Sequence, residues 1–159
     1  MGFRVVEYSA AKIGMTAMLV ALPGCVEGLF GVPTEPDPVI ERPECATGAA
    51  LGETTVSYAE DLVPIMMRVG CLANACHGGS NPSVGFSLAT YARMFEPGSG
   101  ATLNGACPVV PGDPGASYII EKLGVSPRTG RQMPDRRPPL REEELQLFVN
   151  WILEGAANN

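Results

Sequence analysis

The sequence predicts an all-α fold made of a few short helices joined by long loops. Runs that alternate apolar and polar residues, the signature of strands, are nearly absent from the 159 residues. The clearest periodic segment, 141–155, repeats its apolar residues at the spacing of a single helical face. The 19 glycines and 15 prolines indicate long irregular connections between the helices.

Composition narrows the class of protein. Only 6% of the residues are aromatic, and a small core with few aromatic side chains often depends on a prosthetic group or cross-links for its stability. The net charge of −6 argues against nucleic acid or an anionic membrane surface as the main partner.

Residues 1–24 are interpreted as a lipoprotein-type signal peptide. Arg4 and Lys12 give a basic start, and the apolar run 13–22 is too short to span a bilayer. The run ends in Leu-Pro-Gly-Cys25, which resembles a bacterial lipobox whose cysteine is lipidated. We therefore expect a protein on the periplasmic face of a bacterial membrane, held by a lipid anchor only. Val26 is not acidic, which favours the outer membrane. A plain secretory signal, an uncleaved anchor and a buried helix are the alternatives.

Residues 25–56 are rich in Pro, Gly, Glu and Thr, and they predict a tether between the membrane and a folded domain over 57–159. Export would place the chain in an oxidising compartment. Once Cys25, Cys71 and Cys76 are set aside, Cys45 and Cys107 remain as an even pair. We predict a disulfide between them, with two unrelated buried thiols as the alternative.

The domain should begin with a helix. Ser57-Tyr58-Ala59-Glu60 has the form of a capping box, and Gly70 is placed to end the helix. Pro64 should kink it. Short helices are expected at 88–95 and 117–123, and loops at 78–82, 104–114 and 126–139. The last helix, 141–155, has no usual N-cap residue, and Glu142 to Glu144 are expected to be solvated in its first turn, where the helix dipole favours acids.

Cys71-Leu-Ala-Asn-Ala-Cys76-His77 contains the single histidine of the chain. Two thiols followed at once by an imidazole are the groups needed to attach haem covalently and to bind one face of its iron. The usual spacer between the cysteines has two residues, and here it has four. The longer spacer must bulge, yet its slack still permits both thioether bonds.

Iron bound by His77 needs a sixth ligand or an open position. A thioether sulfur suits an electron carrier because it raises the reduction potential. Met133 lies in a polar loop where an apolar residue has no evident packing role, so we predict it as the distal ligand. Met66 and Met67 are expected to pack in the first helix, and Met94 to fill the core.

Three segments, taken together and in order, resemble a known family. They are the attachment site at Cys71–Gly78, the Met133-Pro134 loop, and the segment 140–156 that carries Trp151. Residues 110–118 also resemble a loop and helix start found in bacterial members of the same family. The stretch from 57 to 156 thus resembles a mono-haem class I c-type cytochrome domain.

The resemblance implies a class I cytochrome c-like fold, with short helices and long loops wrapped around one covalent haem c. It also implies that an N-terminal helix crosses a C-terminal helix beside the haem. Cys71 and Cys76 would attach the haem, and His77 and Met133 would bind its iron on the proximal and distal sides.

Other interpretations use the same residues. Cys71 and Cys76 could close a small disulfide loop in an exported domain without haem. A zinc site would have to combine Cys45, Cys107 and His77 with one further thiol. A catalytic thiol–histidine pair is disfavoured because the adjacent residues point apart and the chain has no second histidine.

The predicted function is one-electron transfer in the cell envelope, without enzymatic activity. Redox partner proteins are expected, and the acidic composition favours a basic one. The alternative is a haem enzyme or a gas- or peroxide-reactive module in which Met133 leaves the iron; Arg131 or carboxylates would then supply acid–base groups. The sequence does not indicate an oligomeric state.

Overall fold

The structure is a computed structural model that describes residues 43–159. The predicted signal peptide, the lipidation site Cys25 and the first part of the predicted tether lie outside the described residues. Within the described part, no helix has the length and apolar character needed to cross a membrane.

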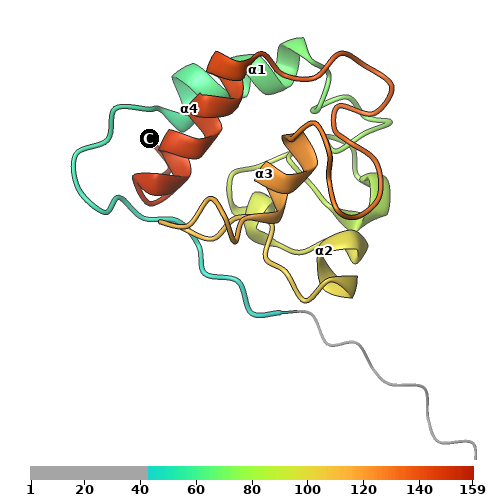
Figure 1. The fold of residues 1–159 in the computed structure, drawn as a ribbon, viewed down its shortest axis with the longest axis horizontal. Helices are drawn as coiled ribbons and strands as arrows, with labels where there is room; N and C mark the ends of the chain where they lie inside the picture. The colour runs from blue at the N-terminus through green and yellow to red at the C-terminus, as the bar shows by residue number, and fades with distance from the viewer. Residues whose placement is uncertain (1–42) are drawn as a thin grey trace, which may run out of the picture. The chain divides into compact units, whose positions relative to one another are not determined.

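The described residues form helices and no strand, which confirms the all-α class (Figure 1). Long loops connect the helices, as the Gly and Pro content predicts. In chain order the elements are the π-helical turn η1 (Tyr58–Leu62), α1 (Val63–Arg68), the 3₁₀ turns η2 (Ser83–Gly85) and η3 (Ala92–Phe95), α2 (Ser99–Leu103), α3 (Tyr118–Leu123) and α4 (Glu142–Leu153).

The first helix begins and ends where the sequence predicts. The Ser57 hydroxyl accepts a hydrogen bond from the Glu60 N–H at 3.1 Å. The return bond of the expected capping box comes from another residue, because Asp61 Oδ2, not Glu60, accepts from the Ser57 N–H at 2.7 Å. At the other end Gly70 has φ +80°, and the Cys71 N–H donates to the Met66 carbonyl at 2.8 Å. This is a Schellman ending, which turns the chain sharply into Cys71.

Pro64 changes the helix that contains it. A proline has no N–H, so it cannot donate to the carbonyl one turn earlier. The chain forms the wider π turn η1, which ends at Leu62, and continues as α1, in which Pro64 lies in the first turn. The irregularity predicted from Pro64 is therefore a change of helix type at its N-terminal side.

The C-terminal helix α4 supplies the centre of the core. Phe148, Trp151 and Ile152 are almost fully buried, and α4 packs against η1. The rings of Tyr58, Tyr91 and Phe95 surround Trp151 at centroid distances of 5.7, 6.5 and 6.5 Å. Four of the seven aromatic residues within 43–159 thus form one cluster around Trp151 of the last helix.

Glu144 corrects the expectation of a solvated helix start. Glu144 is only 4% exposed, and its carboxylate accepts a hydrogen bond from the Arg141 N–H at 3.1 Å. The same carboxylate pairs with the Arg141 side chain and with Arg68 at the end of α1. Arg141, the N-cap residue, has no side chain that accepts from the first turn, but Glu144 at the third helical position accepts from the Arg141 N–H, as in the return bond of a capping box.

The segment 45–56, expected as the end of a tether, is part of the folded unit. Cys45 and Cys107, the predicted pair, form a disulfide with an S–S distance of 2.08 Å. Beyond it, the Ala49 and Leu51 N–H groups donate to the carbonyls of Gly155 and Glu154 at 2.9 and 3.0 Å. We call residues 45–56 the strap. It crosses the end of α4 and fixes it to the domain.

Three short elements differ from the expectations: η3 is shorter than the predicted helix, and η2 and α2 were not predicted. The helix expected at 88–95 is reduced to η3, because the Met94 and Glu96 N–H groups donate to carbonyls only three residues earlier. α2 was not predicted: its sequence, Ser-Gly-Ala-Thr-Leu, is too short and too rich in small residues to show an apolar period.

Candidate functional site

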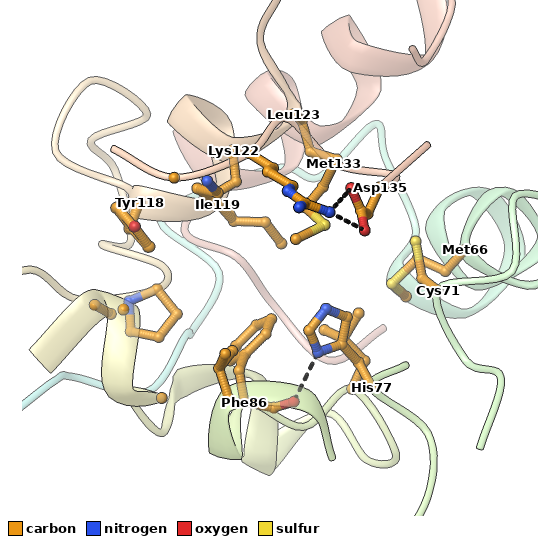
Figure 2. Close-up of a pocket in the computed structure, with 18 of the residues that line it drawn as sticks. Met66, Cys71, His77, Phe86, Tyr118, Ile119, Lys122, Leu123, Met133 and Asp135 are labelled. Atoms are coloured by element: carbon orange, nitrogen blue, oxygen red, sulfur yellow. Dashed lines mark hydrogen bonds and ion pairs between the residues drawn. The ribbon is translucent and has the colours of Figure 1, made fainter. Parts of the chain in front are cut away.

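An apolar cavity of about 300 Å³ lies between α1, α3, α4 and the loops that follow α1 and α3. Its volume is at the lower end of the range for small-molecule sites. Cys71, His77 and Met133 all line it (Figure 2). Phe148 of α4 contributes to its wall. The fold therefore brings three of the four predicted cofactor-binding residues to one space. Cys76, the fourth, is half-buried in the same loop but does not line the cavity.

The four-residue spacer is accommodated by a turn that bulges outward. The His77 N–H donates to the Cys71 carbonyl at 3.1 Å, which closes the loop and brings its two ends together. Within the loop, the Cys76 and Gly78 N–H groups both donate to the Ala73 carbonyl, at 2.9 and 3.2 Å. Ala73, Asn74 and Ala75 are exposed. The two additional residues thus extend into solvent and leave the cavity clear.

Glycine is required directly after His77. A Cβ on Gly78 would lie 2.0 Å from the Leu72 carbonyl oxygen, and one on Gly79 would lie 2.6 Å from that of Asn74. Both contacts are with backbone, which cannot rotate away. The two glycines let the chain pass close to the start of the loop and so keep His77 near Cys71.

The His77 ring is held by one nitrogen. Nδ1 lies 2.9 Å from the Phe86 carbonyl oxygen, which can only accept, so Nδ1 carries the hydrogen and donates. The Phe86 ring contacts the imidazole edge to face, with centroids 5.3 Å apart. Figure 2 shows the other ring nitrogen directed into the cavity, on the side where Met133 lies. In the neutral imidazole, Nε2 is then the nitrogen without a hydrogen, and it faces an apolar space.

An unusual backbone turn positions the Phe86 carbonyl. Val84 and Gly85 have φ of +51° and +70°, and a β-branched residue in this region is strained. Gly98 allows the chain before α2 to pack closely against this turn, because a Cβ at Gly98 would lie only 2.7 Å from the Cβ of Phe86. The Ser99 hydroxyl donates to the Val84 carbonyl at 3.2 Å. The start of α2 thus fixes the acceptor for His77.

Met133 is held from the opposite wall. Its N–H donates to the Lys122 carbonyl at 2.7 Å, which ties the loop after α3 to the end of that helix. Met66 also lines the cavity, but it lies beside Cys71 rather than across from His77 (Figure 2). The packing predicted for Met66 and Met94 is confirmed, since they are 1% and 0% exposed. The packing predicted for Met67 is wrong, since it is 65% exposed.

The Cys71 thiol is poorly suited to nucleophilic catalysis. Burial, followed by the neighbouring Cys76, raises the pKa of the Cys71 thiol, and a backbone hydrogen bond and the nearby Arg137 guanidinium offset this only partly. A raised pKa keeps the thiol protonated at neutral pH, whereas a catalytic cysteine needs the thiolate. Cys71 and Cys76 are not bridged to each other in this structure.

The donor set of the cavity fits haem better than a zinc ion. No group of three or more His, Cys, Asp or Glu side chains within residues 43–159 is arranged to bind a metal. The zinc interpretation needed Cys45 and Cys107, and both are used in the disulfide. One imidazole nitrogen, one thioether and one thiol line the apolar cavity, and the second thiol, Cys76, lies in the adjoining loop. These are the groups that a covalently attached haem requires.

Comparison with protein-family models, curated proteins and solved structures finds no match for this chain.

Two contributors to the site could not be found by sequence reasoning. The Phe86 carbonyl carries no sequence signal, because every residue has a carbonyl and only the turn at Val84 aims this one. Lys122 lines the cavity from α3. From the sequence alone, Lys122 would be expected to be an ordinary solvated cation at the end of a short helix.

Proposed function

We propose that this protein is a one-electron carrier with one covalently attached c-type haem bound by His77 and Met133. The observation that carries the proposal is the His77 ring. Its Nδ1 donates to a backbone carbonyl, while its other nitrogen faces Met133 across an apolar cavity (Figure 2). A histidine that binds a metal typically donates its second ring nitrogen in this way, which fixes the tautomer and raises the basicity of the ligand.

Each residue of the attachment segment has a separate task. Cys71, at one end of the cavity, and Cys76, in the turn beside it, would form the two thioether bonds. The closed loop between Cys71 and His77 fixes the thiol and the imidazole relative to each other. A haem held by these residues would supply the one-electron chemistry. The apolar wall disfavours the additional ferric charge, and the Met133 thioether acts in the same direction.

A second candidate function has one observation in its favour. Arg131 and Asp135 line the cavity close to Met133, and their side chains pair at 3.3 Å. If Met133 were to leave the iron, this pair would supply charged groups on the distal side for a gas- or peroxide-reactive module. Slow binding of carbon monoxide to the reduced protein would support the electron carrier, whereas rapid binding would support the second candidate.

The proposed location follows the sequence prediction. The protein would work in the cell envelope, exported and anchored through a lipid on Cys25, and would exchange electrons with redox partner proteins there. Labelling of the full chain with a radioactive fatty acid tests the anchor, and Cys25→Ser should abolish the label. Label retained in that variant would contradict lipidation at Cys25.

The decisive experiment is to produce the full chain in a bacterium that attaches c-type haem and to record its visible spectrum and mass. We expect a sharp α-band on reduction and a mass increase of one haem that survives denaturation. Cys71→Ala/Cys76→Ala should abolish the covalent haem, whereas Ala73→Ser in the exposed turn should retain it as a matched control. A colourless wild-type protein with the mass of the polypeptide alone would overturn the proposal.

A further inference from the structure

Lys122 is a half-buried cation in the wall of an apolar cavity. Its Nζ donates to the Thr129 carbonyl at 2.7 Å and lies 5.9 Å from the centroid of the Tyr118 ring. Both contacts are with neutral groups. Burial lowers the pKa of Lys122, which reports the cost of holding its charge there.

The other charged groups nearby are already paired. Among residues 43–159, no ion pair includes Lys122. The adjacent Glu121 accepts instead from Arg128, at 2.7 Å, and from the Thr129 N–H. Arg131, a second cation that lines the cavity, pairs with Asp135. Lys122 thus forms no ion pair of its own, although the charge of the adjacent Glu121 partly offsets the effect of burial on its pKa. A cation in an apolar wall is normally paired, so the cavity has room for an anionic group beside Lys122.

The position of Lys122 relative to the cysteines suggests what that partner is. Figure 2 shows Cys71 at one end of the cavity and Tyr118 and Lys122 toward the other. His77 and Met133 lie on opposite walls between these ends. The two vinyl groups of haem lie on one edge of the macrocycle and its two propionates on the opposite edge. A haem linked at the cysteine end therefore directs its propionates toward Lys122.

We propose that Lys122 binds a haem propionate and so forms the carboxylate subsite of this cavity. The inference rests on the proposed function and adds to it the residue that orients the cofactor edge. It also gives a reason for the fixed position of the Lys122 Nζ, which the Thr129 carbonyl and Gly130 define. Gly130, with φ +64°, brings its backbone so close that a Cβ would lie 3.2 Å from Nζ. The Lys122 carbonyl meanwhile anchors Met133, so one residue would fix both a propionate and the distal ligand.

Resonance Raman spectroscopy of the holoprotein tests the inference, because the propionate bending mode reports hydrogen bonds to the carboxylates. Lys122→Gln should shift this mode and lower the reduction potential, since a lost cation makes the ferric charge easier to hold. Lys122→Arg should restore both values toward those of the wild type. Arg131→Gln is the matched control, because it removes a cation of the same cavity that is already paired, and it should leave the mode in place.

The possible outcomes separate the two proposals. Haem attached in the wild type with a propionate mode unchanged in Lys122→Gln would overturn the subsite and leave the proposed function intact. A shift in Arg131→Gln but not in Lys122→Gln would place the propionates at the other cation and would equally overturn it. Absence of haem from the wild type would overturn the proposed function and the subsite together.

Discussion

At the scale of single residues, two methionines line the cavity and only one lies across from His77. Met133 is half-buried on a loop held by a backbone hydrogen bond, while Met66 is buried in α1 beside Cys71. In the sequence, Met133 differs from Met66 because it lies in a polar loop and not in an apolar helix. A methionine in a helix has a packing role, but one in such a loop needs another explanation.

If the proposed function is right, replacing Met133 should change the iron site and not the fold. Met133→Leu keeps the side-chain volume, so we expect a destabilisation of less than about 1.5 kcal/mol. Covalent haem should remain, the weak sulfur-to-iron band in the far red should disappear, and the reduction potential should fall. Met66→Leu is the control and should keep the band. Persistence of the far-red band in Met133→Leu would rule out Met133 as the ligand.

At the scale of elements, a buried carboxylate links the two helices that enclose the site. Glu144 in the first turn of α4 pairs with Arg68 in the last turn of α1, and it accepts from the Arg141 N–H as well. Hydrogen bonds from Arg141, and then the charges of Arg141 and Arg68, lower the pKa of Glu144 against the opposing effect of burial. Since α1 leads directly into Cys71, this link also steadies the attachment loop.

The link should make stability depend on pH. A folded pKa below the ordinary value of 4.5 means that ionised Glu144 stabilises the fold above that pH. This contribution is lost as the pH falls through the folded pKa. We expect Glu144→Gln to lower the free energy of unfolding by about 2 kcal/mol at neutral pH and by almost nothing in strong acid, measured by urea titration. Glu143, with a 66% exposed side chain, is the control, and Glu143→Gln should cost less than about 1 kcal/mol at either pH.

At the scale of the whole molecule, the strap and its disulfide hold the N-terminal side of the domain to its C-terminal end. Tyr91 links the strap to the C-terminal end, because its hydroxyl lies 3.1 Å from the carbonyl oxygen of Gly48 and 2.7 Å from the carbonyl oxygen of Ala156. The Asn159 side chain contacts Thr54 and Val56. The strap thus covers the core between η1, η3 and α4, where the aromatic residues gather.

The disulfide should contribute substantially to stability. Cys45 and Cys107 are 62 residues apart, and closing a loop of this length is worth about 4 kcal/mol in the chain-entropy model. We expect Cys45→Ser/Cys107→Ser to lower the free energy of unfolding of the holoprotein by up to this amount. Dithiothreitol should destabilise the wild type in the same way and leave the double variant unaffected. A wild type and a double variant of equal stability would show that the bridge is not formed in solution.

The sequence by itself determined the features that depend on neighbours along the chain. Ser57, Gly70 and the apolar stripe of 141–155 act through local hydrogen bonds and helical spacing, so the ends of the first helix and the existence of the last one were predictable. Cys71, His77 and Met133 were predictable as candidates because their residue types are rare in such segments. The even pair Cys45 and Cys107 likewise follows from counting.

Tertiary structure alone decided what depends on segments far apart in the chain. The burial of Glu144 requires Arg68, which lies 76 residues away, and no local pattern encodes that contact. The inclusion of the strap in the domain results from its bonds to Gly155 and Glu154. The orientation of His77 depends on a carbonyl aimed by a strained turn, and the place of Lys122 opposite Cys71 depends on how α3 meets the attachment loop. All four features result from tertiary packing. The same residues would have other contacts if these distant segments packed against each other in another arrangement.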